Sequence, residues 1–161
     1  MSRETDIAQQ QWLEDQAIGE CLHVGCGEKP IPWAVNIDPN ESRARWRDHG
    51  YDVHDLPFPD EHFDSVVSSH VLPSLQRISK AMAEMIRVLK IGGHMAHVIP
   101  DWRYAPKRKD ERFEWQYQHQ GWNGPDEFAT FMAKYPQLEV VELCSFEGFN
   151  WSFRVIARRI S

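Results

Sequence analysis

The sequence is poor in cysteine and has no apolar run long enough to cross a bilayer. Its three cysteines, Cys21, Cys26 and Cys144, are odd in number and form no CxxC pair, so neither a disulfide framework nor a structural zinc site is predicted. No segment approaches the roughly 20 apolar residues that a membrane crossing needs. The first residues, MSRETDIAQQQW, lack the charged and then apolar layout of a signal peptide. We therefore expect a cytoplasmic protein with free thiols and no membrane partner.

Positive charge and metal-binding patterns are also scarce. The net charge is -6 and the pI is about 5.7, which argues against nucleic acid as the main partner, because binding a phosphate backbone usually requires a basic surface. The eight histidines include no HExxH pattern and no cluster with ligand spacing, so no metal site is predicted. A chain of 161 residues without internal repeats suits one compact domain.

Short β-like runs and helical patterns alternate along the chain. The β-like runs span residues 21–24, 34–37, 63–68 and 94–99. Between the last two runs, residues 75–90 predict a helix whose apolar face carries Ile78, Met82, Met85 and Leu89. A strand, a helix and a second buried strand in this order are typical of a βαβ unit with parallel strands. The middle of the chain therefore predicts an α/β fold.

The two ends of the chain add further elements. Residues 5–18 predict a lead-in helix, and a second helix is expected to open at Pro125, where a proline and two acids suit a first turn. The β-rich runs 138–146 and 151–159 predict an antiparallel hairpin that closes the sheet. The predicted architecture is a Rossmann-like doubly wound sheet, mostly parallel, with this hairpin at its C-terminal end.

A glycine turn follows the first β-like run directly. Gly25 and Gly27 allow the backbone to turn sharply and leave its amides open to a ligand. Asp38 ends the next apolar run, so its carboxylate is expected beside the turn, where it could accept hydrogen bonds from ribose hydroxyls. This pair favours a nucleoside ligand, although an ordinary turn with a capping acid would show the same pattern.

Three further motifs follow in a characteristic order. They are DLPFPDEHFDSVVSSHVL at 55–72, EMIRVLKIGGHM at 84–95 and VIPD at 98–101. With the GCG turn, this set resembles the class I S-adenosylmethionine-dependent methyltransferases, in particular their short type 11 group. The resemblance covers about residues 20–101 well and 119–159 loosely. It implies S-adenosylmethionine as the cofactor and a methyltransferase-like domain over residues 1–161.

The resemblance also implies roles for the residues of the turn. Gly25, Cys26 and Gly27 would hold the methionine part of the cofactor through backbone groups. Asp38, the acid that closes the second strand, would hold the ribose.

Roles carry over to the next two strands in the same way. Asp55, taken as the acid at the end of a third strand, would contact the adenine amino group, and the backbone amide of Leu56 would meet the ring nitrogen. Ser68, Ser69 and His70 follow the fourth strand and would meet the amino end of the cofactor and face the substrate.

The region after the glycine turn departs from the family pattern. Asp38 follows Gly27 by only 11 positions, and Pro30 and Pro32 lie between them, so a full first crossover helix cannot fit. The loss removes a helix N-terminus that would favour a carboxylate. Lys29 is a candidate replacement for that positive end, although a solvated surface lysine is the commoner case in such a loop.

Methyl transfer from a sulfonium depends mainly on positioning, and a base helps only when the acceptor must lose a proton. The candidate catalytic residues are His70, Asp101 and His119, with His97 as a further choice. Each could instead be a packed or hydrogen-bonded structural residue. Relatives often continue after the position of His70 with Glu-His, whereas this chain has Pro73 and Ser74, which leaves the identity of any base open.

Residues 102–124 interrupt the pattern between the cofactor-binding core at 20–101 and the closing elements at 125–161. This segment is rich in aromatic and basic residues and is expected to form a substrate-side or interaction insert. Its basic residues, which could attract an anionic acceptor, are Arg103, Lys107, Arg108, Lys109 and Arg112. A solvated charged face is an equally good interpretation.

Two other functions remain open at this point. The short length and the missing helix also fit an inactive methyltransferase-like subunit that binds a partner protein. A nicotinamide-binding Rossmann protein is the other alternative, although Pro30 replaces the third glycine of its GxGxxG motif. The partner is thus a small-molecule acceptor or a protein, and seven tryptophans also suit a homo-oligomer.

Overall fold

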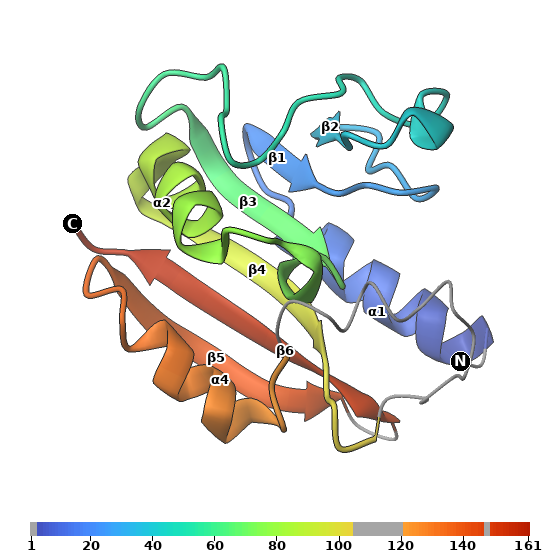
Figure 1. The fold of residues 1–161 in the computed structure, drawn as a ribbon, viewed down its shortest axis with the longest axis vertical. Coiled ribbons are helices and arrows are strands. Elements are labelled where there is room, and N and C mark those ends of the chain that lie inside the picture. Colours follow the sequence, from blue (N-terminus) through green and yellow to red (C-terminus); the bar gives the residue numbers. More distant parts are fainter. Residues whose placement is uncertain (1–2, 105–120, 147–148) are drawn as a thin grey trace.

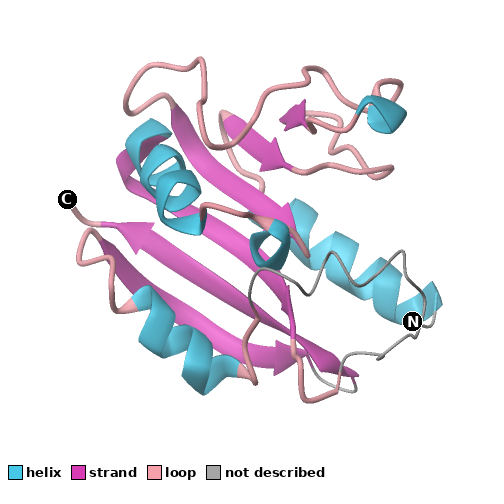
Figure 2. Ribbon diagram, viewed as in Figure 1, coloured by secondary structure: helices cyan, strands magenta, loops and turns pink. Residues whose placement is uncertain are grey.

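A six-stranded sheet forms the centre of the molecule (Figures 1 and 2). The computed structural model describes residues 3–104, 121–146 and 149–161. The strands are β1 Cys21–Val24, β2 Val35–Ile37, β3 Phe63–Ser69, β4 Leu89–Pro100, β5 Leu138–Phe146 and β6 Phe149–Arg159. Strands β2, β1, β3 and β4 are parallel, and β6 pairs antiparallel with both β4 and β5. The predicted Rossmann-like sheet with a C-terminal antiparallel hairpin is confirmed.

The strand order β2-β1-β3-β4-β6-β5 reverses at β1. From β1 the chain moves outward to β2 and then returns to form β3 on the other side of β1. In open α/β sheets, ligands bind outside the carboxyl ends of the strands at such a reversal. Val24 at the end of β1 pairs with Ser68 of β3, so the residues that follow these two strands share one edge of the sheet.

Helices cover both faces of the sheet (Figure 1). They are α1 Arg3–Gln16, α2 Ile78–Val88 and α4 Pro125–Met132, with short 3-10 turns η1 Glu41–Arg43 and η2 Leu72–Ser74. Val67 of β3 belongs to the core beneath Leu13 of α1, whereas its neighbour Val66 belongs to the core beneath Met82 of α2 and Phe128 of α4. This division follows from the alternation of side chains along a strand. Among the described residues, no helix has the length and apolarity needed to cross a membrane.

The central helix is shorter than the apolar pattern predicted. Instead of residues 75–90, α2 covers 78–88, and Leu89 opens β4 by pairing with Phe63. Leu89 is fully buried, so it fits an apolar helix face and a strand equally well, and the pattern alone could not end the helix. Gly92, with φ of +87°, lies where the pairing of β3 with β4 is irregular.

Buried Asn36 stabilises the short connection between β1 and β2, where residues 25–34 are all described and none is helical, as the prolines predicted. Its Oδ1 accepts from the Ile31 N–H at 2.9 Å, and its Nδ2 donates to the carbonyls of Ile31 at 2.9 Å and Ala34 at 3.0 Å. The same Oδ1 lies 2.9 Å from Nδ1 of His23. The side-chain amide of Asn36 thus forms hydrogen bonds with backbone groups of this connection, which has no helix to pair them.

The resemblance implied a strand that ends at Asp55, and this prediction is wrong. Residues 38–62 are all described, and their only pairing with the sheet is an isolated parallel bridge between His49 and Ile37. The chain passes the edge of β2 at His49 and then continues as turns through Asp55.

Candidate active site

The glycine turn and Asp38 lie together, as the sequence predicted. Gly25 and Gly27 have φ of +64° and +56°, and the N–H groups of Gly25 and Cys26 donate to the Ile37 carbonyl at 2.8 and 3.1 Å. The Gly27 N–H donates to Oδ2 of half-buried Asp38 at 3.0 Å. The carboxylate that ends β2 is therefore bonded directly to the turn that ends β1.

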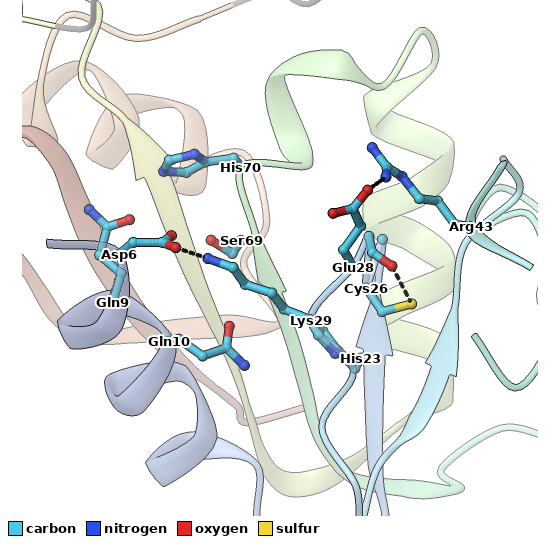
Figure 3. Close-up of a pocket in the computed structure, with 12 residues that line it drawn as sticks. Asp6, Gln9, Gln10, His23, Cys26, Glu28, Lys29, Arg43, Ser69 and His70 are labelled. Carbon is cyan, nitrogen blue, oxygen red and sulfur yellow. Dashed lines mark hydrogen bonds and ion pairs between the residues drawn. The ribbon is translucent and has the colours of Figure 1, made fainter. Parts of the chain in front are cut away.

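A cavity of about 290 Å³ opens beside this turn, at the edge where the strand order reverses (Figure 3). Its walls come from α1, β1, the glycine turn and the loop after it, η1 and the end of β3. The lining residues are Asp6, Gln9, Gln10, His23, Gly25, Cys26, Gly27, Glu28, Lys29, Arg43, Ser69 and His70. Of the predicted cofactor residues, five line the cavity: Gly25, Cys26, Gly27, Ser69 and His70.

Two ion pairs lie on the wall of the cavity. Lys29, the candidate replacement for the missing helix N-terminus, lines the cavity, and its ammonium pairs with the carboxylate of Asp6 (Figure 3). Arg43 of η1 pairs with Glu28, the residue after the glycine turn. Each positive charge on the wall is thus matched by a carboxylate from another segment.

Helix α1 contributes three cavity residues that the sequence analysis did not assign. Asp6, Gln9 and Gln10 have the i, i+3, i+4 spacing of one helix face, so a polar stripe in the predicted lead-in helix could have pointed to them. The position of α1 over the cavity depends on the tertiary packing of Leu13, which no local pattern specifies.

His70 combines backbone strain, partial burial and a place on the cavity wall. Its φ of +57° is unusual for a residue other than glycine, and such strain is often found at functional sites. Its Nε2 lies 3.1 Å from Oγ of Ser152, and its ring meets Trp151 edge to face. Burial lowers the pKa of His70 to about 4, against a smaller opposing effect of the Asp6 carboxylate, so the imidazole is neutral near pH 7.

Ser68 and His97 form a separate pair away from the cavity. Ser68 Oγ lies 2.6 Å from His97 Nδ1, and both residues are fully buried. Alternation along β3 turns Ser68 toward the α2 side of the sheet, opposite to Ser69. Burial lowers the pKa of His97 to about 4.

Asp101 is tied to a neighbouring arginine. Its carboxylate, 1% exposed, accepts from Arg103 Nε at 3.0 Å and Nη2 at 2.8 Å, and also from the Arg103 N–H at 3.0 Å. Asp101 lies outside the lining of the cavity. His119 lies outside the described residues, as do four of the five basic residues of the insert: Lys107, Arg108, Lys109 and Arg112.

The loop expected to contact adenine is arranged differently from the prediction. The Leu56 N–H donates to Oε2 of Glu84 at 2.7 Å, which ties this amide to α2, and Asp55 is exposed on the loop. Asp52 is nearer in sequence to His49, where the chain pairs with β2, and its Oδ1 accepts from the N–H of His54 at 2.9 Å. Neither Asp38 nor Asp55 lines the cavity itself.

Comparison with known proteins identifies the family. A family model described as a methyltransferase domain matches residues 22–97. A protein of Encephalitozoon cuniculi, described as a candidate methyltransferase, is 35% identical over an alignment of 146 residues that covers 80% of this chain and 69% of that protein. The chain belongs to the S-adenosylmethionine-dependent methyltransferases. Three further curated methyltransferases match over only 22 to 30% of their own length.

Solved structures show the same fold. An S-adenosylmethionine-dependent methyltransferase of Thermotoga maritima matches with a TM-score of 0.64 and 21% identity, over 98% of this chain and 94% of that one. The geranyl diphosphate C-methyltransferase of Streptomyces coelicolor, solved with S-adenosylhomocysteine, matches with a TM-score of 0.71 and 13% identity, over 97% and 81%. Membership of this family supports S-adenosylmethionine, the expected cofactor, over the nicotinamide alternative.

Proposed function

We propose that this methyltransferase transfers a methyl group from S-adenosylmethionine to a small molecule or an exposed acceptor group, with the methionine end of the cofactor in the 290 Å³ cavity. The observation that carries the proposal is the bond from Gly27 to Asp38 beside that cavity. It joins the two predicted cofactor contacts at the edge where a ligand of this fold binds.

The residues present fit the cofactor. A Cβ at Gly27 would have no neighbour within 4 Å, so there is space for a ligand beside the turn. The N–H groups of Gly25, Cys26 and Gly27 already donate within the protein, so the expectation of open amides is wrong. The cavity is near the lower limit of about 300 Å³ for small-molecule pockets, so it suits one part of the cofactor. We assign the methionine end to the cavity and the ribose to Asp38. The adenine is assigned to the loop that carries Asp52 and Asp55.

Bound S-adenosylmethionine supplies an activated methyl group, and the protein orients the acceptor against it. Ser69 and His70 line the cavity and are the described residues best placed to meet the acceptor. Neutral His70, held at Nε2 by Ser152, could accept a proton from an acceptor that must lose one, although its lowered pKa makes it a weak base. Asp101 is not assigned this role because Arg103 occupies its carboxylate.

The binding site is tested by calorimetric titration with S-adenosylmethionine and S-adenosylhomocysteine. We expect the wild type to bind both and Asp38→Ala to bind about 30-fold more weakly, since hydrogen bonds to a charged group are lost. Asp15→Ala, an exposed acid on α1, is the matched control and should bind as the wild type. Equal affinity in Asp38→Ala would remove the ribose assignment.

Catalysis is tested separately from binding. A screen of small acceptors and of candidate partner proteins with labelled S-adenosylmethionine should yield a methylated product. Tight binding of the cofactor without methylation of any acceptor would favour the inactive, partner-binding alternative.

A further inference from the structure

Lys29 reaches across the cavity from the loop after the glycine turn to α1 (Figure 3). Its ammonium pairs with Asp6, and the two side chains are 48% and 39% exposed. An ion pair this exposed contributes little to stability, so breaking it costs little free energy. The pair therefore leaves the lysine available to a ligand anion that enters the cavity.

Gln9, one turn along α1 from Asp6, supplies an independent observation. It lines the same cavity and is only 3% exposed, yet its Nε2 has no hydrogen-bond acceptor among the residues that the structure describes. Buried donors of this kind are rare and call for an explanation. An acceptor oxygen from a ligand in the cavity would provide one.

Both donors line the cavity beside a connection that lacks a crossover helix, Lys29 from that connection and Gln9 from α1. Helix N-termini favour anions, and residues 25–34 contain no helix to offer one to a carboxylate near the glycine turn. Since the proposed function places the methionine end of the cofactor in this cavity, its carboxylate would enter the space that both Lys29 and Gln9 line. The inference below rests on that proposed function.

We propose that Lys29 and Gln9 form the subsite for the cofactor carboxylate, and that Asp6 occupies Lys29 as an internal competitor until the cofactor replaces it. The other charges on the wall do not alter this assignment, because Glu28 and Arg43 are paired with each other. Binding therefore exchanges one carboxylate for another on the same ammonium. Gln9 gains the acceptor that it otherwise lacks.

The test compares two ligands that share a nucleoside and a sulfur. S-adenosylhomocysteine carries the carboxylate, and 5′-methylthioadenosine lacks the amino-acid end. In calorimetric titrations we expect Lys29→Ala and Gln9→Met to bind S-adenosylhomocysteine about 10-fold more weakly, as the loss of a charged hydrogen bond predicts, and to bind 5′-methylthioadenosine unchanged. Asp6→Asn should bind S-adenosylhomocysteine about 3-fold more tightly, because an exposed ion pair no longer competes.

Matched controls separate this effect from general loss of charge. Lys90 pairs with Asp64 at 3.0 Å with similar exposures of 43% and 38%, and it lies outside the cavity lining, so Lys90→Ala should bind both ligands as the wild type. Unchanged binding of S-adenosylhomocysteine by Lys29→Ala, or equal weakening of both ligands, would overturn the subsite and leave the proposed function standing. A wild type that binds neither ligand would overturn both.

Discussion

Two regions of this methyltransferase each pair a histidine with a buried serine, and they differ in what lies beside the pair. On the cavity wall, His70 bonds Ser152. In the core beneath α2 and α4, His97 bonds Ser68. Burial lowers the pKa of both histidines to about 4. The same shift from the same cause therefore occurs at a candidate active site and in a packed interior.

The comparison shows that a shifted pKa identifies a site only together with access. His70 lines a cavity and has a strained backbone, and each of these features is consistent with a role beyond packing. His97 is fully buried and lies outside the lining of this cavity. The Nε2 atom of His97 has no partner in the described part of the chain. Its burial therefore lowers the stability of the fold and does not indicate a role in chemistry.

The largest expected effect concerns stability against pH, which both histidines should influence and which His97 tests without altering the cavity. Because the pKa of His97 is about 4 when folded and near 6.5 when unfolded, the unfolded chain takes up a proton first as the pH falls. This group should therefore lower the free energy of unfolding by about 3 kcal/mol between pH 6.5 and 4, with no effect above that range. Denaturant titrations of wild type and His97→Leu at several pH values measure the difference in slope.

A variant whose stability falls as steeply as the wild type would show that His97 is protonated or hydrated in the folded state. Other groups also titrate in this range, so only the difference between the two proteins is informative. The difference in the free energy of unfolding between the two proteins at neutral pH reports the change in packing and the lost bond to Ser68. It is a separate quantity from the difference in slope.

A smaller effect on the free energy of unfolding distinguishes Gly25 from Gly27 at the edge of the cavity. Both have positive φ, but a Cβ at Gly25 would lie 2.4 Å from Val71 Cγ2, whereas one at Gly27 would meet nothing within 4 Å. We expect Gly25→Ala to lose about 2 kcal/mol from backbone strain and overpacking, and Gly27→Ala about 1 kcal/mol from strain alone. Thermal unfolding measures both. Equal losses would mean that Val71 moves aside without cost.

For ligand binding, the order of the two variants should be reversed, with the larger loss in Gly27→Ala. At Gly27 the open space is where the proposed cofactor approaches, so Gly27→Ala should weaken S-adenosylhomocysteine more than its small effect on stability suggests. Tight binding by this variant would place the ligand elsewhere.

The sequence predicted the strands and the nearness of Asp38 to the turn, because both follow from local signals. Apolar runs define β1 to β4, and a parallel sheet must bring the ends of its first two strands together. The resemblance failed at Asp55, where the implied strand is absent, since pairing at the edge of β2 depends on contacts far along the chain. The division of the chain at residues 102–124 stays a prediction.

Side-chain partners were the least predictable part of the site. No motif indicates that Arg103 binds Asp101 two positions away, that Glu84 accepts from the amide of Leu56, or that Asp6 pairs with Lys29. Two of these three contacts join residues more than 20 positions apart, and they decide which candidate groups remain available for chemistry. Candidate lists from motifs are therefore too long, and the fold shortens them.

The smallest expected effect, on stability, returns to the two serines. Ser68→Ala and Ser152→Ala each remove one hydrogen bond to a neutral histidine, so each should lower the free energy of unfolding by about 1 kcal/mol. The variants should differ in function, because only Ser152 holds a ring that faces the cavity. Once a methyl acceptor has been identified, Ser152→Ala should lower kcat with little change in the affinity for S-adenosylhomocysteine. Ser68→Ala should leave both kcat and this affinity unchanged. Equal turnover in the two variants would reduce His70 to a packed residue like His97, and the comparison between the two regions would lose its functional meaning.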